Sequence, residues 1–235
     1  MAKHIILIEG NICAGKTITV EYLKNNKEQF NQFLENGEHV TTLSEFVDPI
    51  GVELFYHDRK KYSGIFEDSC RMGKLNRHLK AKEGSGIYIF DRGMIGGAET
   101  FSKNSFLEGY LSHEDHENYQ KNIKRGLDQL DRTQQHKWLE QLVVYLRIDD
   151  EDVLVARQKQ RATPGETIPI EYLKTINRMY ESFFNNIETV YAKYAVNAPK
   201  VITVDATKDF NEDRNYHQKI LDRIIEELGE MDNGN

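Results

Sequence analysis

The sequence predicts an α/β fold in which helices cover both faces of a five-stranded parallel sheet, giving three layers. Short apolar runs alternate along the chain with longer segments of helical periodicity, which is the pattern of such sheets. The first run, His4-Ile5-Ile6-Leu7-Ile8, is almost continuously apolar, as a central strand covered on both faces requires. A glycine-containing turn follows this run directly and precedes a helical pattern, which is typical of a phosphate-binding loop.

The remaining elements follow from periodicity. Four further strands are expected at residues 39–43, 87–90, 142–148 and 200–205. Apolar residues at three-and-four spacing predict helices over 62–79, 119–130, 172–194 and 216–228. Aromatic stripes at this spacing are more often core than ligand site, so we assign them to packing.

The composition suits one domain. The chain has 235 residues, of which 39% are hydrophobic and 29% charged, enough for a single domain over 1–230 with a flexible tail at 231–235. Apolar runs are too short to span a membrane and no signal peptide is evident, so a cytoplasmic protein is expected. A net charge of −7 without a basic block argues against long nucleic acid as the main partner.

The segment Gly10-Asn11-Ile12-Cys13-Ala14-Gly15-Lys16-Thr17 fits the spacing of a P-loop. Its glycines let the backbone turn so that successive N–H groups face phosphate oxygens at a helix N-terminus. Lys16 could reach the outer phosphates, and the Thr17 hydroxyl could ligate Mg²⁺. By itself the loop predicts only that phosphate is bound. Together with the acceptor side described next, it predicts a three-layer P-loop kinase with ATP and Mg²⁺ as cofactors.

Asp91-Arg92 follows the third expected strand, at the edge of the sheet where ligands bind. Three interpretations of Asp91 remain open. It could be a ligand of Mg²⁺ or of its water, a general base for the acceptor hydroxyl, or only the cap of the next helix.

At this point the chain resembles the deoxynucleoside kinase family, from Ile5 to about Leu228. Glu45-Phe46-Val47 is similar to the family's Glu-Pro-Val, and Asp91-Arg92-Gly93 to its Glu-Arg-Ser or Asp-Arg-Ser. Other matching segments are the P-loop from Ile8 to Thr17, the nucleoside-pocket segment from Tyr56 to Phe66, the lid from Arg157 to Arg161, and Ile168 to Leu173, which is close to Ile-Pro-Leu-Glu-Tyr-Leu. Several ordered matches are more specific than any one of them.

The resemblance implies phosphorylation of the 5′-hydroxyl of a deoxynucleoside by ATP. Asp91 would deprotonate that hydroxyl, while Glu45 would hold it and help to order Mg²⁺-bound water. Arg92 would stabilise transition-state charge opposite Lys16. The metal site would then comprise Thr17, Glu45 and Asp91. The family usually dimerises through long helices, so a homodimer is expected, with 112–136 and 170–195 as candidate surfaces.

The lid and the acceptor pocket also follow from the resemblance. Arg157 and Arg161 lie four residues apart, so both could close on the triphosphate, although a solvated basic helix end is the alternative. Asp209 and Phe210 would border the ATP base. On the acceptor side, Tyr56 would contact the sugar 3′-hydroxyl, Phe66 and Phe101 would sandwich the base, and Glu166 would join the substrate contacts.

Departures from the family pattern lie in the acceptor-base pocket. Glu67 stands where many relatives carry Gln, Lys74 where several carry Arg, Gly97 where some carry Asp, and Gly93 where they carry Ser. Glu67 and Lys74 could pair with each other or together read a base. A purine deoxynucleoside, with deoxyguanosine as first candidate, is favoured, and Gly96 and Gly97 could leave room for a modified base.

Two other functions remain open. Arg59, Arg71, Lys74 and Arg77 could clamp an acceptor that already carries phosphate, such as a nucleotide or DNA. A non-catalytic nucleotide sensor is a further alternative, which the retained Lys16, Asp91 and Arg92 disfavour.

Overall fold

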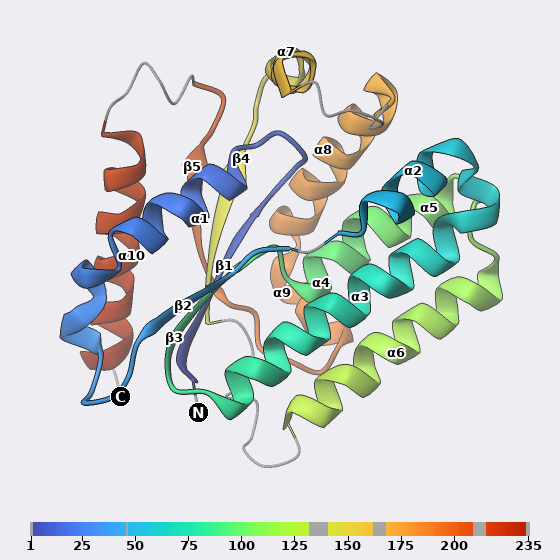
Figure 1. The fold of residues 1–235 in the computed structure, drawn as a ribbon. Helices are drawn as coiled ribbons and strands as arrows, with labels where there is room; N and C mark the ends of the chain where they lie inside the picture. The colour runs from blue at the N-terminus through green and yellow to red at the C-terminus, as the bar shows by residue number, and fades with distance from the viewer. Residues whose placement is uncertain (1, 46, 132–140, 162–167, 209–214, 234–235) are drawn as a thin grey trace.

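In a computed structural model, five parallel strands form one sheet in the order β2-β3-β1-β4-β5 (Figure 1). The structure describes residues 2–45, 47–131, 141–161, 168–208 and 215–233. The strands are β1 (Ala2–Gly10), β2 (Val40–Leu43), β3 (Gly86–Asp91), β4 (Leu142–Arg147) and β5 (Lys200–Asp205). All five predicted strands are confirmed, and the almost continuously apolar first run is the central strand. Its Ile5, Ile6, Leu7 and Ile8 are at most 1% exposed.

Helices pack on both faces of the sheet, as the α/β prediction requires. Figure 1 shows α1 and α10 on one side and α3, α6 and α8 on the other. The helices are α1 (Lys16–Asn25), α2 (Pro49–His57), α3 (Arg59–Glu83), α4 (Met94–Gly97), α5 (Lys103–Leu107), α6 (His113–Asp131), α7 (Glu151–Arg161), α8 (Ile170–Asn185), α9 (Ile187–Lys193) and α10 (Tyr216–Asn233). A 3-10 helix, η1 (Lys27–Phe33), and a π-helix, η2 (Ala98–Ser102), complete the set.

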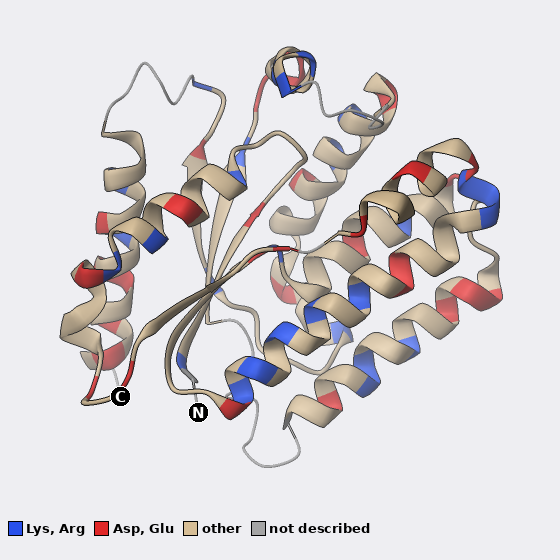
Figure 2. Ribbon diagram, viewed as in Figure 1, with Lys and Arg blue, Asp and Glu red and all other residues tan. Residues whose placement is uncertain are grey.

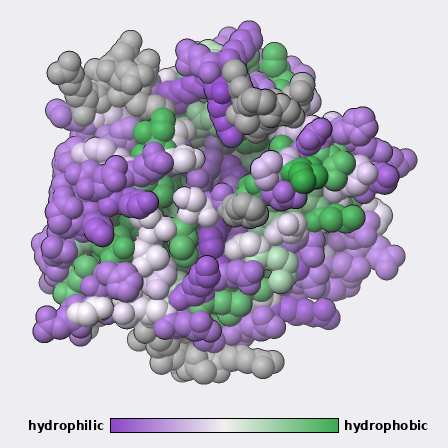
Figure 3. Space-filling model, viewed as in Figure 1, coloured by the Kyte–Doolittle hydropathy of each residue, from purple (hydrophilic) through white to green (hydrophobic). Residues whose placement is uncertain are grey.

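Helix α3 departs from its predicted apolar pattern. Ile65 and Met72, expected on its packed face, are 73% and 42% exposed, and Figure 3 shows apolar surface over this part of the molecule and α2. The buried side of α3 is instead largely polar, with Ser63, Glu67, Arg71, Lys74, Arg77 and His78 among its members. Polar groups are buried at a cost unless they have partners. This helix is therefore built to line a site rather than to fill a core.

Two other predictions of helix extent need correction. The helix expected over 172–194 is interrupted at Asn186, where α8 ends and α9 begins. Residues 231–233, expected as part of a tail, continue α10. Asp232 near its end pairs with Lys3 at 3.1 Å and with His4 at 3.0 Å, which ties this end of the helix to β1.

The described ranges contain helices of several lengths. None of the helices found there combines the length and apolar character that crossing a bilayer demands.

Candidate active site

A cavity of about 1160 Å³ opens at the carboxyl ends of the strands. Figure 3 shows this face hollowed near its centre, between α1 and α2. Most predicted site residues line the cavity: Ile12, Cys13, Gly15, Lys16, Thr17, Glu45, Tyr56, Phe66, Glu67, Lys74, Asp91, Arg92, Phe101, Arg157 and Arg161. Gly10, Asn11, Ala14 and Gly97 lie beside the lining, and Glu166, Asp209 and Phe210 fall outside the described residues.

The P-loop has the conformation that its glycines allow. Gly10 has φ 150°, and a Cβ there would lie 2.9 Å from the carbonyl oxygen of Leu146, so only glycine fits beside β4. Gly15 caps α1 with φ 98°. The Asn11 amide donates to the carbonyl of Leu173 at 2.9 Å, which fastens the loop to α8. The role of Asn11 is therefore to hold the loop in place.

Lys16 lies at the floor of the cavity and is 8% exposed. Its ammonium donates to the carbonyl oxygen of Asn11 at 2.8 Å. Burial, followed by the nearby positive charge of Arg92, lowers the pKa of Lys16 to about 8. Phosphate oxygens would supply the negative charge that this buried ammonium needs.

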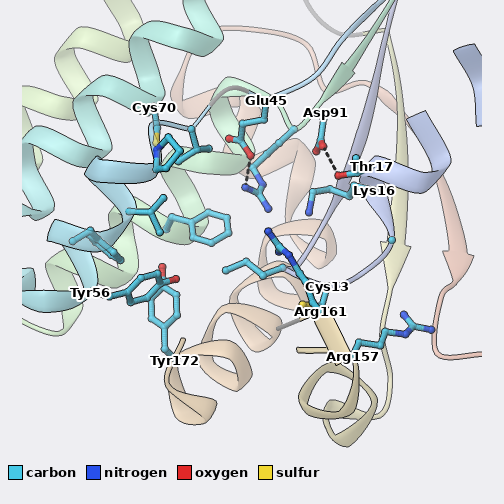
Figure 4. A pocket seen from close by; sticks show the side chains of 18 of the residues that line it. Cys13, Lys16, Thr17, Glu45, Tyr56, Cys70, Asp91, Arg157, Arg161 and Tyr172 are labelled. Atoms are coloured by element: carbon cyan, nitrogen blue, oxygen red, sulfur yellow. Dashed lines mark hydrogen bonds and ion pairs between the residues drawn. The ribbon is translucent and has the colours of Figure 1, made fainter. Parts of the chain in front are cut away.

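Asp91 and Thr17 face each other across the floor of the cavity (Figure 4). The Thr17 hydroxyl donates to Asp91 Oδ2 at 3.4 Å. The other carboxylate oxygen, Oδ1, is buried and has no hydrogen-bond partner in the structure. No cluster of three metal-ligating side chains occurs within the described segments. The pair nevertheless fits Mg²⁺, which takes one or two protein oxygens and completes its shell with phosphate and water.

Glu45 is held from two sides. Arg92 Nη1 donates to its Oε2 at 2.6 Å, and Lys74 Nζ lies 3.3 Å from its Oε1. Burial alone would raise the pKa of Glu45, but the charges of Arg92 and then Lys74 outweigh burial and lower it to about 2. Glu45 is therefore an ionised acceptor of hydrogen bonds at neutral pH.

Arg92 has a strained backbone conformation, and contacts hold its side chain in place. Its backbone adopts φ 64°, a left-handed conformation that costs a residue other than glycine about 1–2 kcal/mol. Its Nε donates to the Tyr180 hydroxyl at 3.1 Å, and its guanidinium lies 4.5 Å from the centre of the Phe101 ring. Backbone strain of this kind clusters at functional sites. The sequence contained no signal for this conformation.

Basic residues along α3 are conspicuous in Figure 2, yet their partners are internal. Arg77 donates to the carbonyls at the ends of β2 and β3 and to that of Arg92, at 3.1, 2.7 and 2.9 Å. Arg71 pairs with Asp68, and Arg59 pairs with Glu108 while lying over the Tyr110 and Tyr172 rings. These three arginines do not line the cavity, and each has a contact within the protein, although Arg59 Nε and Nη2 are buried without a hydrogen-bond partner among the described residues. The geometry therefore favours a structural role for them over a clamp for an acceptor phosphate.

Aromatic rings enclose the acceptor side of the cavity. Phe66 and Phe101 line it as predicted, and Tyr56 lies with its ring centre 6.1 Å from that of Tyr172. Tyr172 and Phe55 also line the cavity. The sequence pattern had indicated a core position for Tyr172 and had given no indication for Phe55. Helical spacing predicts only that Tyr172 faces inward, and an inward-facing residue can lie in the core or line a pocket.

Glu67 lies deep in this pocket and is 4% exposed. The hydroxyl of Ser105 donates to its Oε1 at 3.2 Å. Burial is the main cause that raises the pKa of Glu67 to about 7, against the opposing charge of Lys74. Two alternatives were predicted for Lys74, namely an ion pair with Glu67 or joint recognition of a base. The ion pair in the structure joins the Lys74 ammonium to Glu45, so the prediction of Glu67 as its ion-pair partner is wrong.

Charged side chains from other elements occupy the space beside the two glycines of α4. A Cβ at Gly96 would lie 2.5 Å from Glu9 Oε1, and one at Gly97 would lie 2.4 Å from Lys74 Nζ. Glu9, which the sequence analysis did not single out, accepts from the Gly93 backbone N–H at 2.6 Å. The space expected here for a modified base is therefore occupied by the protein.

The two lid arginines point in different directions. Figure 4 shows Arg161 directed into the cavity toward Lys16, and Arg157 directed away from it. Arg157 donates to the carbonyl oxygen of Lys208 at 2.8 Å, in the segment after β5. In this conformation only Arg161 reaches toward the P-loop, although both lie on α7.

Comparisons with known proteins agree with this geometry. The family model described as deoxynucleoside kinase matches residues 6–229. The chain is 25% identical over 190 residues to mitochondrial thymidine kinase 2 of Homo sapiens, covering 77% of this chain and 64% of that protein, which is less than two thirds. It is 22% identical over 253 residues to deoxycytidine kinase 1 of Xenopus laevis, covering 96% and 91%.

A solved structure supports the fold. Deoxyadenosine kinase from M. mycoides with bound dATP superposes with a TM-score of 0.68 at 22% identity, over 94% of this chain and 98% of that one. The relatives differ in the nucleoside that their names specify, so family membership alone leaves the acceptor base open. The match over residues 6–229 nevertheless shows that the chain belongs to the deoxynucleoside kinase family, whose members are phosphotransferases with an alcohol acceptor.

Proposed function

We propose that this protein transfers the γ-phosphoryl group of ATP to the 5′-hydroxyl of a purine deoxynucleoside, with deoxyguanosine as the first candidate. One observation carries the proposal. A P-loop with Lys16 and Thr17 shares a single cavity with an aromatic pocket whose polar members are Glu67 and Lys74. A phosphate donor and a planar base can thus be bound with the sugar between them.

The donor half is assigned to the P-loop side. Lys16 binds the outer phosphates, and Arg161 neutralises charge from the lid. Thr17 and Asp91 would hold Mg²⁺ directly or through water, and the ion would neutralise the charge that develops on the phosphates. We therefore favour the metal-side interpretation of Asp91 over the general base that the resemblance implies, because its partner is Thr17.

The acceptor hydroxyl is assigned to Glu45. Its carboxylate pairs with Lys74 of the base pocket and with Arg92 beside the P-loop, which supports this assignment. The hydroxyl oxygen would bond to the γ-phosphorus as the bond between that phosphorus and the β–γ bridging oxygen breaks, releasing ADP. The hydroxyl proton would pass to Glu45 and then to solvent, which restores the carboxylate. A loose transition state needs orientation more than a strong base, so a carboxylate of low pKa suffices.

The preference for a purine rests on Glu67 and Lys74. A carboxylate can accept the N–H and NH₂ donors of a guanine edge, and an ammonium has three donors, of which Glu45 takes one. Phe66 and Phe101 supply stacking faces. Of the four residues considered for binding an acceptor phosphate (Arg59, Arg71, Lys74 and Arg77), Lys74 lines the cavity and the three arginines do not. A free nucleoside therefore fits the cavity better than an acceptor that carries phosphate.

The direct test is turnover of the four natural deoxynucleosides with ATP and Mg²⁺, with products separated by chromatography. We expect deoxyguanosine and deoxyadenosine to give the highest kcat/KM, and Lys16→Met to abolish turnover. Lys24→Met, an exposed lysine of the same helix, serves as the matched control. A clear preference for thymidine, or activity on monophosphates and oligonucleotides but not on nucleosides, would overturn the proposal.

The roles of the two carboxylates are separable by their metal dependence. Asp91→Asn should raise the Mg²⁺ concentration needed for half-maximal rate. Glu45→Gln should lower kcat by about 10²-fold or more at saturating Mg²⁺ and leave that concentration unchanged. The opposite pattern would restore Asp91 as the group that receives the hydroxyl proton.

A further inference from the structure

Lys74 is buried at the boundary between the base pocket and the reaction centre. It lies on α3 and is 5% exposed, and its ammonium is 3.3 Å from Glu45 Oε1. Arg92 reaches the other oxygen of Glu45 from the turn after β3. The carboxylate is therefore held at both oxygens by cations that come from different elements.

Gly97 makes the position of Lys74 possible. An added Cβ would lie 2.4 Å from Lys74 Nζ and 3.4 Å from its Cε, so a side chain at Gly97 would displace the ammonium. The backbone of Gly97 has φ −61° and ψ −39°, which any residue adopts in a helix. A side chain at Gly97 therefore conflicts with the present position of the Lys74 ammonium and not with the backbone conformation.

We propose that Lys74 and Gly97 form a positioning unit for Glu45, in which the glycine leaves the volume that the ammonium fills and the ammonium fixes the carboxylate for the 5′-hydroxyl. The proposal rests on the function proposed above, because that function gives Glu45 its substrate. Lys74 is a positioning residue here, since it acts on the reaction through Glu45.

The first test is structural and needs no substrate. Crystal structures of the wild type, Lys74→Met and Gly97→Ala are compared at Glu45. Lys74→Met removes the ammonium, and Gly97→Ala should move it out of reach of Glu45 Oε1, so in both variants the Glu45 carboxylate should shift from its wild-type position. Lys80→Met, exposed on the same helix, and Gly64→Ala, which has space for a methyl group, should leave that position unchanged.

The second test is kinetic. Lys74→Met and Gly97→Ala should each lower kcat about 10- to 100-fold, because small displacements of a positioning group are costly in rate. In the Lys74→Met background, Gly97→Ala should add less than about twofold, since the ammonium it displaces is already gone. Additive losses, or a Gly97→Ala protein with an unchanged Glu45 position and unchanged kcat, would overturn the positioning unit.

The two proposals fail differently. If the wild-type protein phosphorylates no deoxynucleoside, the proposed function fails, and the crystal structures of the variants alone still decide whether Lys74 and Gly97 act together on Glu45. Thermal unfolding of each variant checks the fold, and alanine at a helical position gives Gly97→Ala no backbone penalty.

Discussion

The buried carboxyl of Glu67 should make the stability of this protein depend on pH in a way that one substitution removes. Its pKa lies at about 7 in the folded protein against an ordinary value of 4.5. The folded state therefore binds the proton more tightly than the unfolded state. The stability that this group contributes is complete below pH 4.5 and is lost as pH rises through about 7. Glu67→Gln keeps the shape of the side chain and abolishes the titration.

The size of the effect follows from the shift. At 1.36 kcal/mol per pKa unit, the change from 4.5 to about 7 corresponds to about 3 kcal/mol. Between about pH 4 and pH 8, the wild-type protein should lose about that much stability relative to Glu67→Gln. For a chain of this length the difference corresponds to roughly 6–12 °C in Tm. The groups facing Glu67 are Lys74, Arg59, Glu45, Ser105, Cys70, Tyr119 and Tyr172.

The assay is urea unfolding, followed by circular dichroism at a series of pH values, for the wild type, Glu67→Gln and Glu83→Gln. Glu83 lies exposed on the same helix, so its variant should follow the wild type at every pH. The informative quantity is the slope of the unfolding free energy with pH, because a constant offset reflects only packing. Equal slopes for the wild type and Glu67→Gln would refute the argument.

Three further predictions follow from contacts in the site. Arg77→Met should destabilise the protein by about 3 kcal/mol or more, measured by urea unfolding, because two buried carbonyls and one part-buried carbonyl lose their donor. Gly10→Ala should weaken ATP binding in calorimetry and lower Tm, since its Cβ would meet the Leu146 carbonyl, whereas Gly229→Ala meets nothing within 4 Å. Removing Mg²⁺ with a chelator should abolish turnover, and Thr17→Ala should raise the Mg²⁺ concentration that restores it.

The strands and the P-loop were predictable because each depends on local pattern. The run from Ile5 to Ile8 is apolar at every position, and only a strand covered on both faces buries all of them. The loop from Gly10 to Thr17 combines strand, glycine spacing and helix start in a single segment. The start of helix α2 was also predictable, because Asp followed by Pro is a common helix start. Asp48 is the N-cap before Pro49, and its side chain accepts from the backbone N–H of Gly51 at 3.1 Å.

The partners of the polar residues were not predictable, since they depend on how distant segments meet. Spacing along α3 pointed to Glu67 as the partner of Lys74, whereas the fold brings Glu45 to the ammonium instead. The same spacing suggested an apolar face that includes Ile65, which is exposed because the opposite face lines the cavity. The left-handed backbone of Arg92 arises from tertiary contacts, and no residue pattern encodes it.

Because charged side chains occupy the space beside Gly96 and Gly97 of α4, the order in which mutations arise in this pocket matters. Any side chain introduced at Gly97 meets the Lys74 ammonium, and any at Gly96 meets the Glu9 carboxylate. A variant library that tries to install a new base-reading group at Gly97 therefore begins with a loss, unless position 74 has already been shortened. Adaptation to another nucleoside by this route requires the change on α3 to come first, and the reverse order passes through impaired intermediates.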